Sequence, residues 1–211
     1  MTYIIMGPQG SGKGTQADII SKKYGLEHVS IGDLLRAEVA SGSETGKIVE
    51  KYMREGALIP MHINNAIVKK VLEKNKNILL DGYPRNREQA EFITQNANPK
   101  CVIIININEE ESIKRLTKRL ICTATNKIYI EDKITEKDRE ECEAKGGQLI
   151  KRDDDKPEAI KKRLEIYNNE TKPVIKIFQE QKIPVIEING EKTIEEITNE
   201  ITEKLEPYIE Q

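Results

Sequence analysis

The stretch that decides the fold is Gly7-Pro8-Gln9-Gly10-Ser11-Gly12-Lys13-Gly14-Thr15, which directly follows the short apolar segment Tyr3 to Met6. A helical pattern beginning Gln16-Ala17-Asp18-Ile19-Ile20 comes next. Glycines let the backbone turn tightly so that its N–H groups point at phosphate oxygens, and a helix N-terminus adds positive potential. The order of strand, glycine-rich loop and helix therefore predicts a nucleotide phosphate-binding loop.

This loop departs at one position from the general pattern G-x-x-x-x-G-K-[ST]. Gly14 stands where a magnesium-binding hydroxyl is expected, and Thr15 follows one residue later. The hydroxyl is thus displaced and not absent, while Lys13 supplies the mobile positive charge. A plain glycine-rich turn between a strand and a helix is the alternative interpretation.

Outward from the loop, short apolar segments alternate with longer amphipathic ones. The predicted strands are Tyr3 to Met6, Glu27 to Val29, Ile78 to Asp81, Val102 to Ile107 and Pro184 to Ile188. Short β-branched runs of this kind suit strands buried in a parallel sheet, whose neighbours need helical crossover connections. We therefore predict an α/β fold, a doubly wound five-stranded parallel sheet flanked by helices.

Two stretches do not fit the alternation. Residues 30–59 show helical patterns without an intervening strand, and residues 118–155 contain an extended Ile128-Tyr129-Ile130 between turn signals at Thr125-Asn126-Lys127 and Gly146-Gly147. Both are predicted to be small inserted lobes. The core then consists of residues 1–29, 60–117 and 156–211, and insertions after strand ends would stand over the ligand crevice.

Composition excludes several classes of function. The 211 residues carry 34 basic and 36 acidic side chains, so the net charge is −2 and gives no reason to expect binding to nucleic acid or to a membrane surface. The longest strongly apolar run, Val102 to Ile105, is far shorter than the ~20 residues of a membrane-spanning helix. We expect a cytoplasmic protein. Three cysteines, an odd number, do not suggest a disulfide framework, and we interpret Cys101, Cys122 and Cys142 as reduced thiols.

Several segments together resemble the adenylate kinases, a family of nucleoside monophosphate kinases. The phosphate-loop spelling Gly12-Lys13-Gly14-Thr15-Gln16-Ala17 is similar to that of the family. The further matching segments, in family order, are Ser30-Ile31-Gly32-Asp33-Leu34-Leu35-Arg36, Gly56-Ala57-Leu58-Ile59-Pro60, Asp81-Gly82-Tyr83-Pro84-Arg85 with Gln89, and Arg152-Asp153-Asp154-Asp155 with Arg163. Tyr83 stands where phenylalanine is usual. The resemblance spans nearly the whole chain and identifies the long-lid form.

The resemblance implies reversible, magnesium-dependent transfer of a phosphoryl group from ATP to AMP, which gives two ADP. The partners would be ATP, AMP and ADP, and the family favours a monomer. Residues 30–59 would be an AMP-binding lobe and residues 118–155 a lid over ATP. A transition state with charge spread over three oxygens requires many cations, and the planar guanidinium of arginine suits phosphate oxygens.

By resemblance, each site residue receives a role. The expected catalytic residues are Lys13, Arg85, Arg119, Arg152 and Arg163. The expected ATP site consists of Gly10, Ser11, Gly12, Lys13, Gly14, Thr15, Arg115, Arg119, Ile128, Tyr129 and Lys192. The expected AMP site consists of Ser30, Arg36, Ala57, Leu58, Ile59, Gly82, Tyr83, Pro84, Arg85, Gln89, Arg152 and Arg163. Asp81 would orient Mg²⁺ through its water molecules.

The residues by themselves leave simpler roles open. Arg115 and Arg119 are four apart on what the pattern indicates is an amphipathic helix, where solvated charges are ordinary. Asp81 could cap the turn that follows it, Asp33 could cap a helix, and Tyr129 could be a packing residue.

The lid positions that hold structural zinc in one branch of the family read Cys122, Thr125, Cys142 and Lys145 here. Threonine is a poor zinc ligand and protonated lysine is none, so we expect no structural zinc. Substitute ligands would have to come from acidic residues such as Asp132, Asp138 or Glu143. Without zinc, we expect a lid closed by packing and hydrogen bonds.

Three other functions compete with the main interpretation. A UMP or CMP kinase of the same fold is the nearest, although the long insertion between Arg119 and Arg152 speaks against it. A regulator that binds nucleotide without turning it over would not need the acceptor-site arginines, which are present. A metal or nucleic-acid binding protein lacks a full ligand set and a basic surface.

Overall fold

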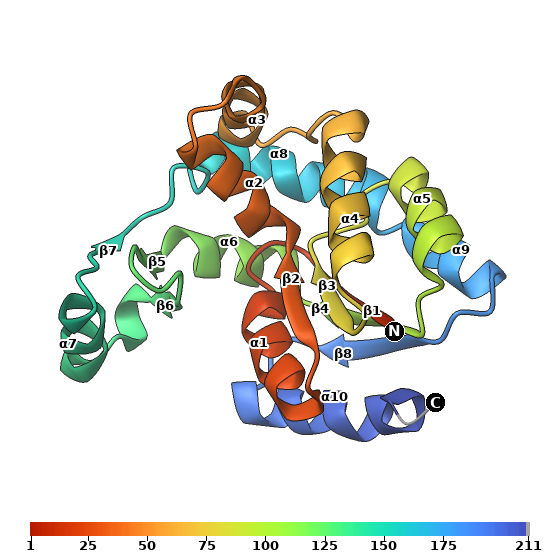
Figure 1. The fold of residues 1–211 in the computed structure, drawn as a ribbon. Helices are drawn as coiled ribbons and strands as arrows, with labels where there is room; N and C mark the ends of the chain where they lie inside the picture. The colour runs from red at the N-terminus through yellow and green to blue at the C-terminus, as the bar shows by residue number, and fades with distance from the viewer. Residues whose placement is uncertain (210–211) are drawn as a thin grey trace.

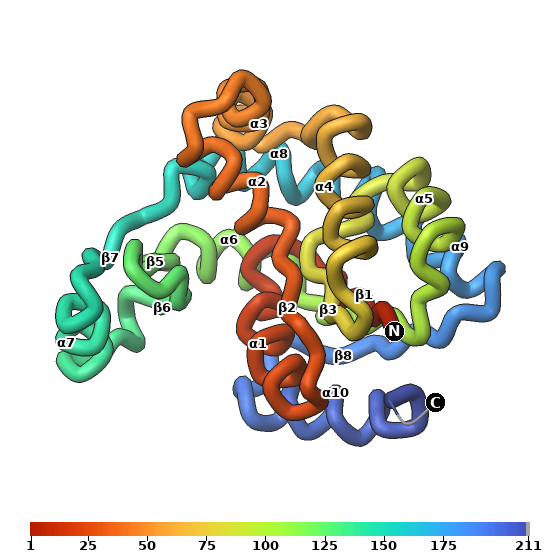
Figure 2. Tube along the Cα trace, viewed as in Figure 1, coloured from red at the N-terminus to blue at the C-terminus, as the bar shows by residue number. Residues whose placement is uncertain are grey.

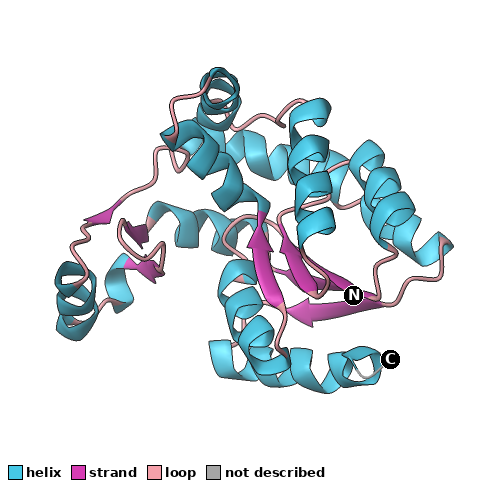
Figure 3. Ribbon diagram, viewed as in Figure 1, coloured by secondary structure: helices cyan, strands magenta, loops and turns pink. Residues whose placement is uncertain are grey.

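A computed structural model describes residues 1–209 and contains a central five-stranded parallel sheet (Figures 1 and 3). The strands, in spatial order, are β2 (Glu27–Ser30), β3 (Ile78–Asp81), β1 (Thr2–Met6), β4 (Cys101–Asn106) and β8 (Val185–Asn189). All four neighbouring pairs are parallel, which confirms the predicted fold class. The predicted strand bounds differ from the observed ones by one or two residues at most.

Helices cover both faces of the sheet. The helices outside the two insertions are α1 (Lys13–Tyr24), α4 (Met61–Lys74), α5 (Arg87–Ala97), α6 (Glu109–Thr117), α8 (Pro157–Ile166), the π-helix η2 (Tyr167–Thr171), α9 (Val174–Glu180) and α10 (Ile194–Ile209). Of these, α6 and α8 pack against each other in a small cluster of their own. Successive strand residues point to opposite faces, so the apolar side chains of the strands pack into two separate cores, one on each face of the sheet. One core packs the strands against α1 and α10, and the other packs them against helices that include α4, α5 and α9 (Figure 1).

The first insertion, between β2 and α4, contains two helices. These are α2 (Ile31–Ala40) and α3 (Glu44–Arg54). Each begins at a serine N-cap, because Ser30 and Ser43 accept hydrogen bonds from the backbone N–H three residues on. The chain leaves the core after β2 and returns at α4, and this lobe stands at the top of the tube in Figure 2.

The second insertion forms a separate lobe with its own three-stranded antiparallel sheet, in the order β6-β5-β7 (Figure 3, left). Its elements are β5 (Arg119–Cys122), β6 (Ile128–Ile130), the 3₁₀ turn η1 (Glu131–Lys133), α7 (Glu136–Ala144) and β7 (Leu149–Ile150). The structure corrects the predicted helix through Arg119: α6 ends at Thr117, and Arg119 begins a strand. Strand pairing with β6 and β7, which is not local in sequence, overrides the helical spacing there.

Within residues 1–209, no helix is both long and apolar enough to cross a membrane.

Candidate active site

The phosphate-binding loop lies at the carboxyl end of β1 and leads directly into α1. A Cβ atom at Gly7 would lie 2.4 Å from the carbonyl oxygen of Ile105, so the loop can pass β4 only with glycine there. Gly12 has a φ of 86°, and no described side chain caps α1. The first N–H groups of α1 are therefore open to a phosphate. Lys13 begins the helix, and its Nζ donates to the carbonyl oxygen of Pro8 over 3.3 Å.

Asp81 lies beside this loop because β3 pairs with β1 and ends at this residue. Its Cα atom is opposite that of Ile5 in the parallel register, and only 7% of the residue is exposed. The Oδ1 atom is buried without a hydrogen-bond partner among residues 1–209. A buried carboxylate oxygen without a partner costs free energy, whereas oxygen ligands and ordered water suit Mg²⁺. The environment of Asp81 therefore fits a hydrated magnesium ion.

His28, on β2, is a neighbour of Asp81 that the sequence interpretation missed. Its Nε2 lies 3.6 Å from Oδ2 of Asp81, and its Nδ1 lies 2.6 Å from Oδ1 of Asp18. Burial alone would lower the pKa of His28, but its contacts with the two carboxylates outweigh burial and raise the pKa. The only available sequence signal was the alternation of β2, which places His28 and Ser30 on the same face of the strand.

A narrow crevice separates the phosphate loop from the segment after β3. Residues that line it include Gly7, Gln9, Lys13, Gly82, Arg85 and Thr171. Burial lowers the pKa of Lys13 to about 8; Asp81 opposes this effect, and the charges of Arg85, Arg163 and Arg119 add to it. Lys13 therefore lies in a strongly positive field, which suits a polyanionic ligand.

Three of the predicted arginines meet at the point where the chain returns from the lid. Arg119 Nε donates to Asp155 Oδ2 over 2.7 Å, and a second bond joins its guanidinium to the same carboxylate. Arg152 makes two bonds of 2.9 Å to the carboxylate of Asp154. Arg163 donates to the carbonyl oxygen of Asp154 over 2.9 Å. Arg119 thus bonds a carboxylate 36 positions away, and the three arginines form one buried charge cluster near Lys13 and Arg85.

The carboxylates of Asp154 and Asp155 are the counter-ions of this cluster, a role that the sequence interpretation did not assign. Burial alone would raise the pKa of Asp154, but the charges of Arg152 and Arg163 and bonds to Arg152 hold it well below its usual range. Only 4% of the Asp155 side chain is exposed. The run Arg152-Asp153-Asp154-Asp155 was the available signal, but spacing alone does not say which charges pair.

On the other side of the crevice, Arg85 is held by contacts along its backbone and side chain. Its Nε donates to the carbonyl oxygen of Gly82 over 2.8 Å, its N–H donates to Gln89 Oε1 over 2.8 Å, and its carbonyl oxygen accepts from Thr171 Oγ1 over 2.7 Å. Thr171 was not predicted. Burial, the largest influence, lowers the pKa of Arg85, and the charge of Arg36 acts in the same direction. Both guanidiniums therefore contribute to one electrostatic environment.

Arg36 and the remaining predicted acceptor residues come from the first inserted lobe and the segment after it. Arg36 Nε donates to Asp33 Oδ1 over 3.1 Å, so Asp33 is an ion-pair partner as well as an early residue of α2. Ala57 and Leu58 are partly exposed and Ile59 is buried, between α3 and α4. The amide Nε2 of Gln89 is buried with no hydrogen-bond partner among the described residues. A donor in that position could serve a ligand.

The residues predicted to bind ATP lie farther from one another than those predicted to bind AMP. Arg115 bonds Glu111 and reaches the carbonyl oxygen of Gly10 over 3.4 Å, so it does contact the phosphate loop. Lys192 is exposed and pairs with Glu200 of α10. Ile128 is 39% exposed on the lid sheet. Tyr129 is 8% exposed and packs in the lid core, so in this conformation a contact between Tyr129 and a nucleotide would have to use its backbone.

The structure corrects the interpretation of the lid cysteines. Cys122 and Cys142 are joined by a disulfide, and only Cys101 is a free, buried thiol. The lid brings together two cysteines that are 20 positions apart, which an odd count in the sequence could not reveal. Sulfurs bonded to each other are not thiolate ligands. Among residues 1–209 no group of three or more His, Cys, Asp or Glu side chains is arranged to hold a metal ion.

The fold and the site define a class of protein. A phosphate loop between β1 and α1, a carboxylate at the end of the adjacent strand and an arginine cluster under two inserted lobes are features of a P-loop phosphotransferase.

Comparison with known proteins gives the family. Residues 5–183 match the adenylate kinase family. The chain is 35% identical to the adenylate kinase of Petrotoga mobilis over all of both chains. It is 38% identical to that of Archaeoglobus fulgidus, with 98% of each chain covered, and 38% identical to that of Pyrococcus horikoshii, with 100% and 96% covered. The chain belongs to the adenylate kinase family, the ATP:AMP phosphotransferases.

Proposed function

We propose that this chain catalyses the reversible, magnesium-dependent transfer of the γ-phosphoryl group of ATP to AMP, producing two ADP. The observation that carries the proposal is the positive crevice: burial and three neighbouring arginines lower the pKa of Lys13 to about 8, directly beside the open N-terminus of α1. A site that transfers a phosphoryl group needs such an arrangement, because its main tasks are positioning and charge neutralisation.

The donor phosphates would bind the phosphate loop. The N–H groups of residues 10–15 and the charge of Lys13 would surround the β- and γ-phosphates, and Thr15 would supply the hydroxyl that Gly14 lacks. Arg115, already against the carbonyl oxygen of Gly10, would cover the loop from α6. Arg119 would approach from the lid. The adenine would lie near the exposed Ile128, the backbone of Tyr129, and Lys192.

The acceptor would bind between the first inserted lobe and the segment after β3. Arg36 and Arg85 would hold the phosphate of AMP. Gln89 Nε2, buried and without a partner among residues 1–209, would donate to the adenine edge. Ser30 and the segment Ala57 to Ile59 would complete the slot, in which a different base would leave buried polar groups unpaired.

Arg152 and Arg163 would bridge the two substrates and stabilise the charge on the transferred group. Mg²⁺, when bound, neutralises phosphate charge, and Asp81 would hold its water ligands through the free Oδ1. Asp154 and Asp155 now pair with the guanidiniums of Arg152, Arg163 and Arg119. Phosphate oxygens would compete for the same N–H groups as the lid closes and excludes water.

A coupled assay of ADP formation tests the proposal. AMP, UMP, CMP and GMP are offered in turn with ATP and Mg²⁺, and AMP should have a kcat/KM at least about tenfold higher than the others, since the base slot is built for one set of hydrogen bonds. A preference for UMP or CMP would assign the chain to a pyrimidine kinase activity. Nucleotide binding without turnover would assign it to a regulatory role.

A further inference from the structure

We propose that the pair Cys122 and Cys142 is a thiol–disulfide site that controls the order of the lid. When the disulfide is formed it fastens α7 to the lid sheet, and when it is reduced the lid loosens while the core stays folded. The consequence for nucleotide binding rests on the proposed function, because the lid is there assigned to the phosphate donor. The restraint that the disulfide places on α7, called the clamp below, does not depend on that assignment.

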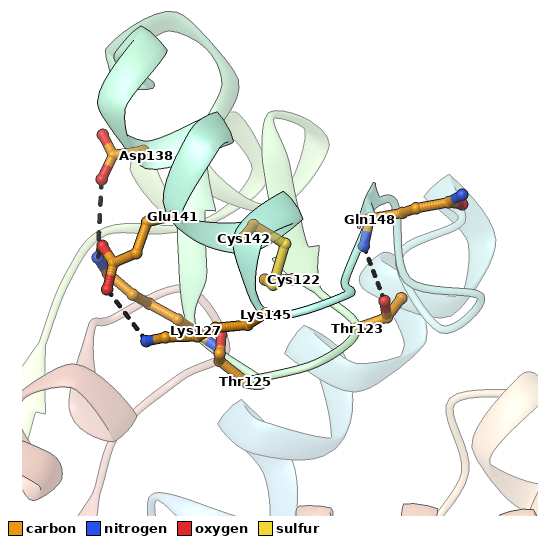
Figure 4. Close-up of a disulfide and its surroundings, with 9 residues drawn as sticks. All are labelled: Cys122, Thr123, Thr125, Lys127, Asp138, Glu141, Cys142, Lys145 and Gln148. Atoms are coloured by element: carbon orange, nitrogen blue, oxygen red, sulfur yellow. Dashed lines mark hydrogen bonds and ion pairs between the residues drawn. A yellow bond between two sulfur atoms is a disulfide. The ribbon is translucent and has the colours of Figure 1, made fainter.

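The disulfide joins two elements that little else connects. Cys122 is the last residue of β5, Cys142 lies near the end of α7, and Figure 4 shows the bond between their sulfur atoms. That core contains Leu120, Cys122, Tyr129 and Cys142, with Ile134 and Leu149 packed against them. Two of its six side chains are therefore the two halves of the disulfide.

Helix α7 has no other apolar anchor among the described residues. Cys142 is its one buried residue, and the rest of Glu-Lys-Asp-Arg-Glu-Glu-Cys-Glu-Ala is polar or exposed. Residues 118–155 are also within the size range, below about 40 residues, in which a domain usually needs a disulfide, a metal or a partner. The covalent bond therefore supplies what the small apolar core does not.

The polar contacts of α7 are weak substitutes for that bond. Lys127 lies 3.6 Å from Asp138 and 3.3 Å from Glu141, and Lys145 lies 3.2 Å from Glu141 (Figure 4). These side chains are partly or well exposed to solvent. Ion pairs of exposed side chains contribute little to stability and are screened by salt.

A glycine and two hydrogen bonds hold the segments that follow the two cysteines close to each other. Gly147 follows α7, and a Cβ atom there would lie 2.8 Å from Cys122 Sγ and 2.7 Å from the Ala124 side chain. The Thr123 N–H donates to the Gln148 carbonyl oxygen over 3.0 Å, and the Gln148 N–H donates to Thr123 Oγ1 over 2.9 Å. These bonds align the segments after Cys122 and after Cys142, so the two thiols lie next to each other.

Oxidation would proceed by exchange with a low-molecular-weight disulfide. The thiolate of one cysteine attacks the external disulfide, forms a mixed disulfide and releases one thiolate. The second cysteine then attacks the protein sulfur of that mixed disulfide, closes the Cys122–Cys142 bond and releases the second thiolate. Two protein thiols lose two electrons and two protons, and the external disulfide gains them as two thiols. Because both cysteines are buried when the disulfide is formed, α7 must lift off transiently before an external thiolate can reduce the bond.

Strand β5 connects the disulfide to residues that are proposed to bind the phosphate donor. Arg119 begins this strand, three residues before Cys122, and is paired with Asp155 at the return to the core. Ile128 lies on the neighbouring strand β6, opposite Ile121. A lid without α7 would present these residues less often in the arrangement that binds nucleotide, so apparent affinity would fall with the fraction of ordered lid.

The first experiment establishes the bond and the clamp. The full chain is equilibrated with oxidised or with reduced glutathione, and free thiols are counted in denaturant. Oxidised protein should show one free thiol of three, which is Cys101, and reduced protein should show three. Tryptic cleavage within residues 118–155 should be on the order of 100-fold faster in the reduced form, the factor that loop-closure entropy gives for a loop of about 20 residues.

Matched variants separate the clamp from a general effect of reductant. Cys142→Ala and Cys122→Ala should be cleaved rapidly in both glutathione mixtures, whereas Cys101→Ala, which removes a buried thiol from β4, should behave as the wild type does. The main thermal transition of the core should remain in every form. Three free thiols after oxidation, or equal cleavage rates of oxidised and reduced wild type, would overturn the proposal.

Binding is measured separately, by calorimetry with a non-hydrolysable ATP analogue and Mg²⁺. Reduction should weaken binding of the analogue and leave binding of AMP unchanged. Faster cleavage with unchanged analogue affinity would refute the link between lid and donor. Failure of the ADP-formation assay would instead refute the proposed function, since cleavage and thiol counts do not involve turnover.

Discussion

Tyr83→Phe removes one hydroxyl from the core and should lower the free energy of unfolding by about 1 kcal/mol, the net value of a typical hydrogen bond. The Tyr83 side chain is 1% exposed, and its hydroxyl donates to Asn65 Oδ1 of α4 over 2.8 Å. Phenylalanine keeps the ring and creates little cavity. Asn65 is only partly buried, so water can replace the lost donor and limit the cost. Phenylalanine is also the residue that the family resemblance leads one to expect there.

Urea unfolding followed by circular dichroism measures this effect, and a double-mutant cycle assigns it. For a chain of this length, about 1 kcal/mol corresponds to a Tm lower by about 2–4 °C. The matched change is Asn65→Ala. If the bond between the two residues is the cause, the double variant should be less destabilised than the sum of the singles by about 1 kcal/mol.

The pH dependence of the difference in unfolding free energy between the wild type and the Tyr83→Phe variant gives a second check. Burial raises the pKa of Tyr83 above its ordinary value of about 10. Above about pH 10 the unfolded chain loses this phenolic proton while the folded chain keeps it, so the wild type loses stability as pH rises, and the Tyr83→Phe variant has no such proton to lose. The gap between wild type and variant should therefore narrow above about pH 10. Equal stability at neutral pH, or a gap that does not change as the pH is raised well past the ordinary tyrosine pKa, would refute the reasoning.

Two further predictions concern the crevice. Arg85→Ala and Arg152→Ala should each lower kcat/KM by roughly two to four orders of magnitude, because charge-stabilising arginines in phosphoryl transfer raise the rate by a factor of about 10³ or more. Circular dichroism should show that both variants keep the fold. Near-normal activity in either variant would show that its arginine does not have the assigned role. Because the pKa of Lys13 is lowered to about 8, kcat/KM for ATP should fall as the pH rises above about 8 and the ammonium loses its proton. In Lys13→Arg the guanidinium stays charged, so this alkaline fall should disappear even though activity is lower, and a wild-type profile that stays flat to about pH 9.5 would contradict the electrostatic account.

The fold was largely predictable because its strongest determinants are local. The glycine-rich loop and the short apolar runs of the strands each favour their own conformation, and the parallel sheet follows from the alternation of these runs with helices. The five predicted strands are confirmed. The lid was predicted less well, because α7 has a single buried residue, Cys142, and therefore almost no apolar periodicity to detect.

The sequence indicated which residue types the site contains, but it did not indicate which side chains form ion pairs and hydrogen bonds with each other. Lys13 and Arg85 line one crevice, and the charge of Arg152 acts on Arg85. The sequence led to these residues by family resemblance, and their individual roles stay predictions. The counter-ions Asp154 and Asp155, the contact of His28 with Asp81 and the bond from Thr171 to Arg85 did not follow. Each depends on which side chains face each other after packing.

The sequence by itself therefore determined the phosphate loop, the class of sheet and the chemistry available at the crevice, because glycine, β-branched residues and charged side chains carry those properties wherever they stand. Only the tertiary structure decided the pairing of Cys122 with Cys142, the strand that begins at Arg119, and the buried position of Tyr129. All three arise in the lid, where β5 pairs with strands before and after α7. Such contacts join residues distant in sequence, and their energy depends on a packed arrangement that no local spacing encodes.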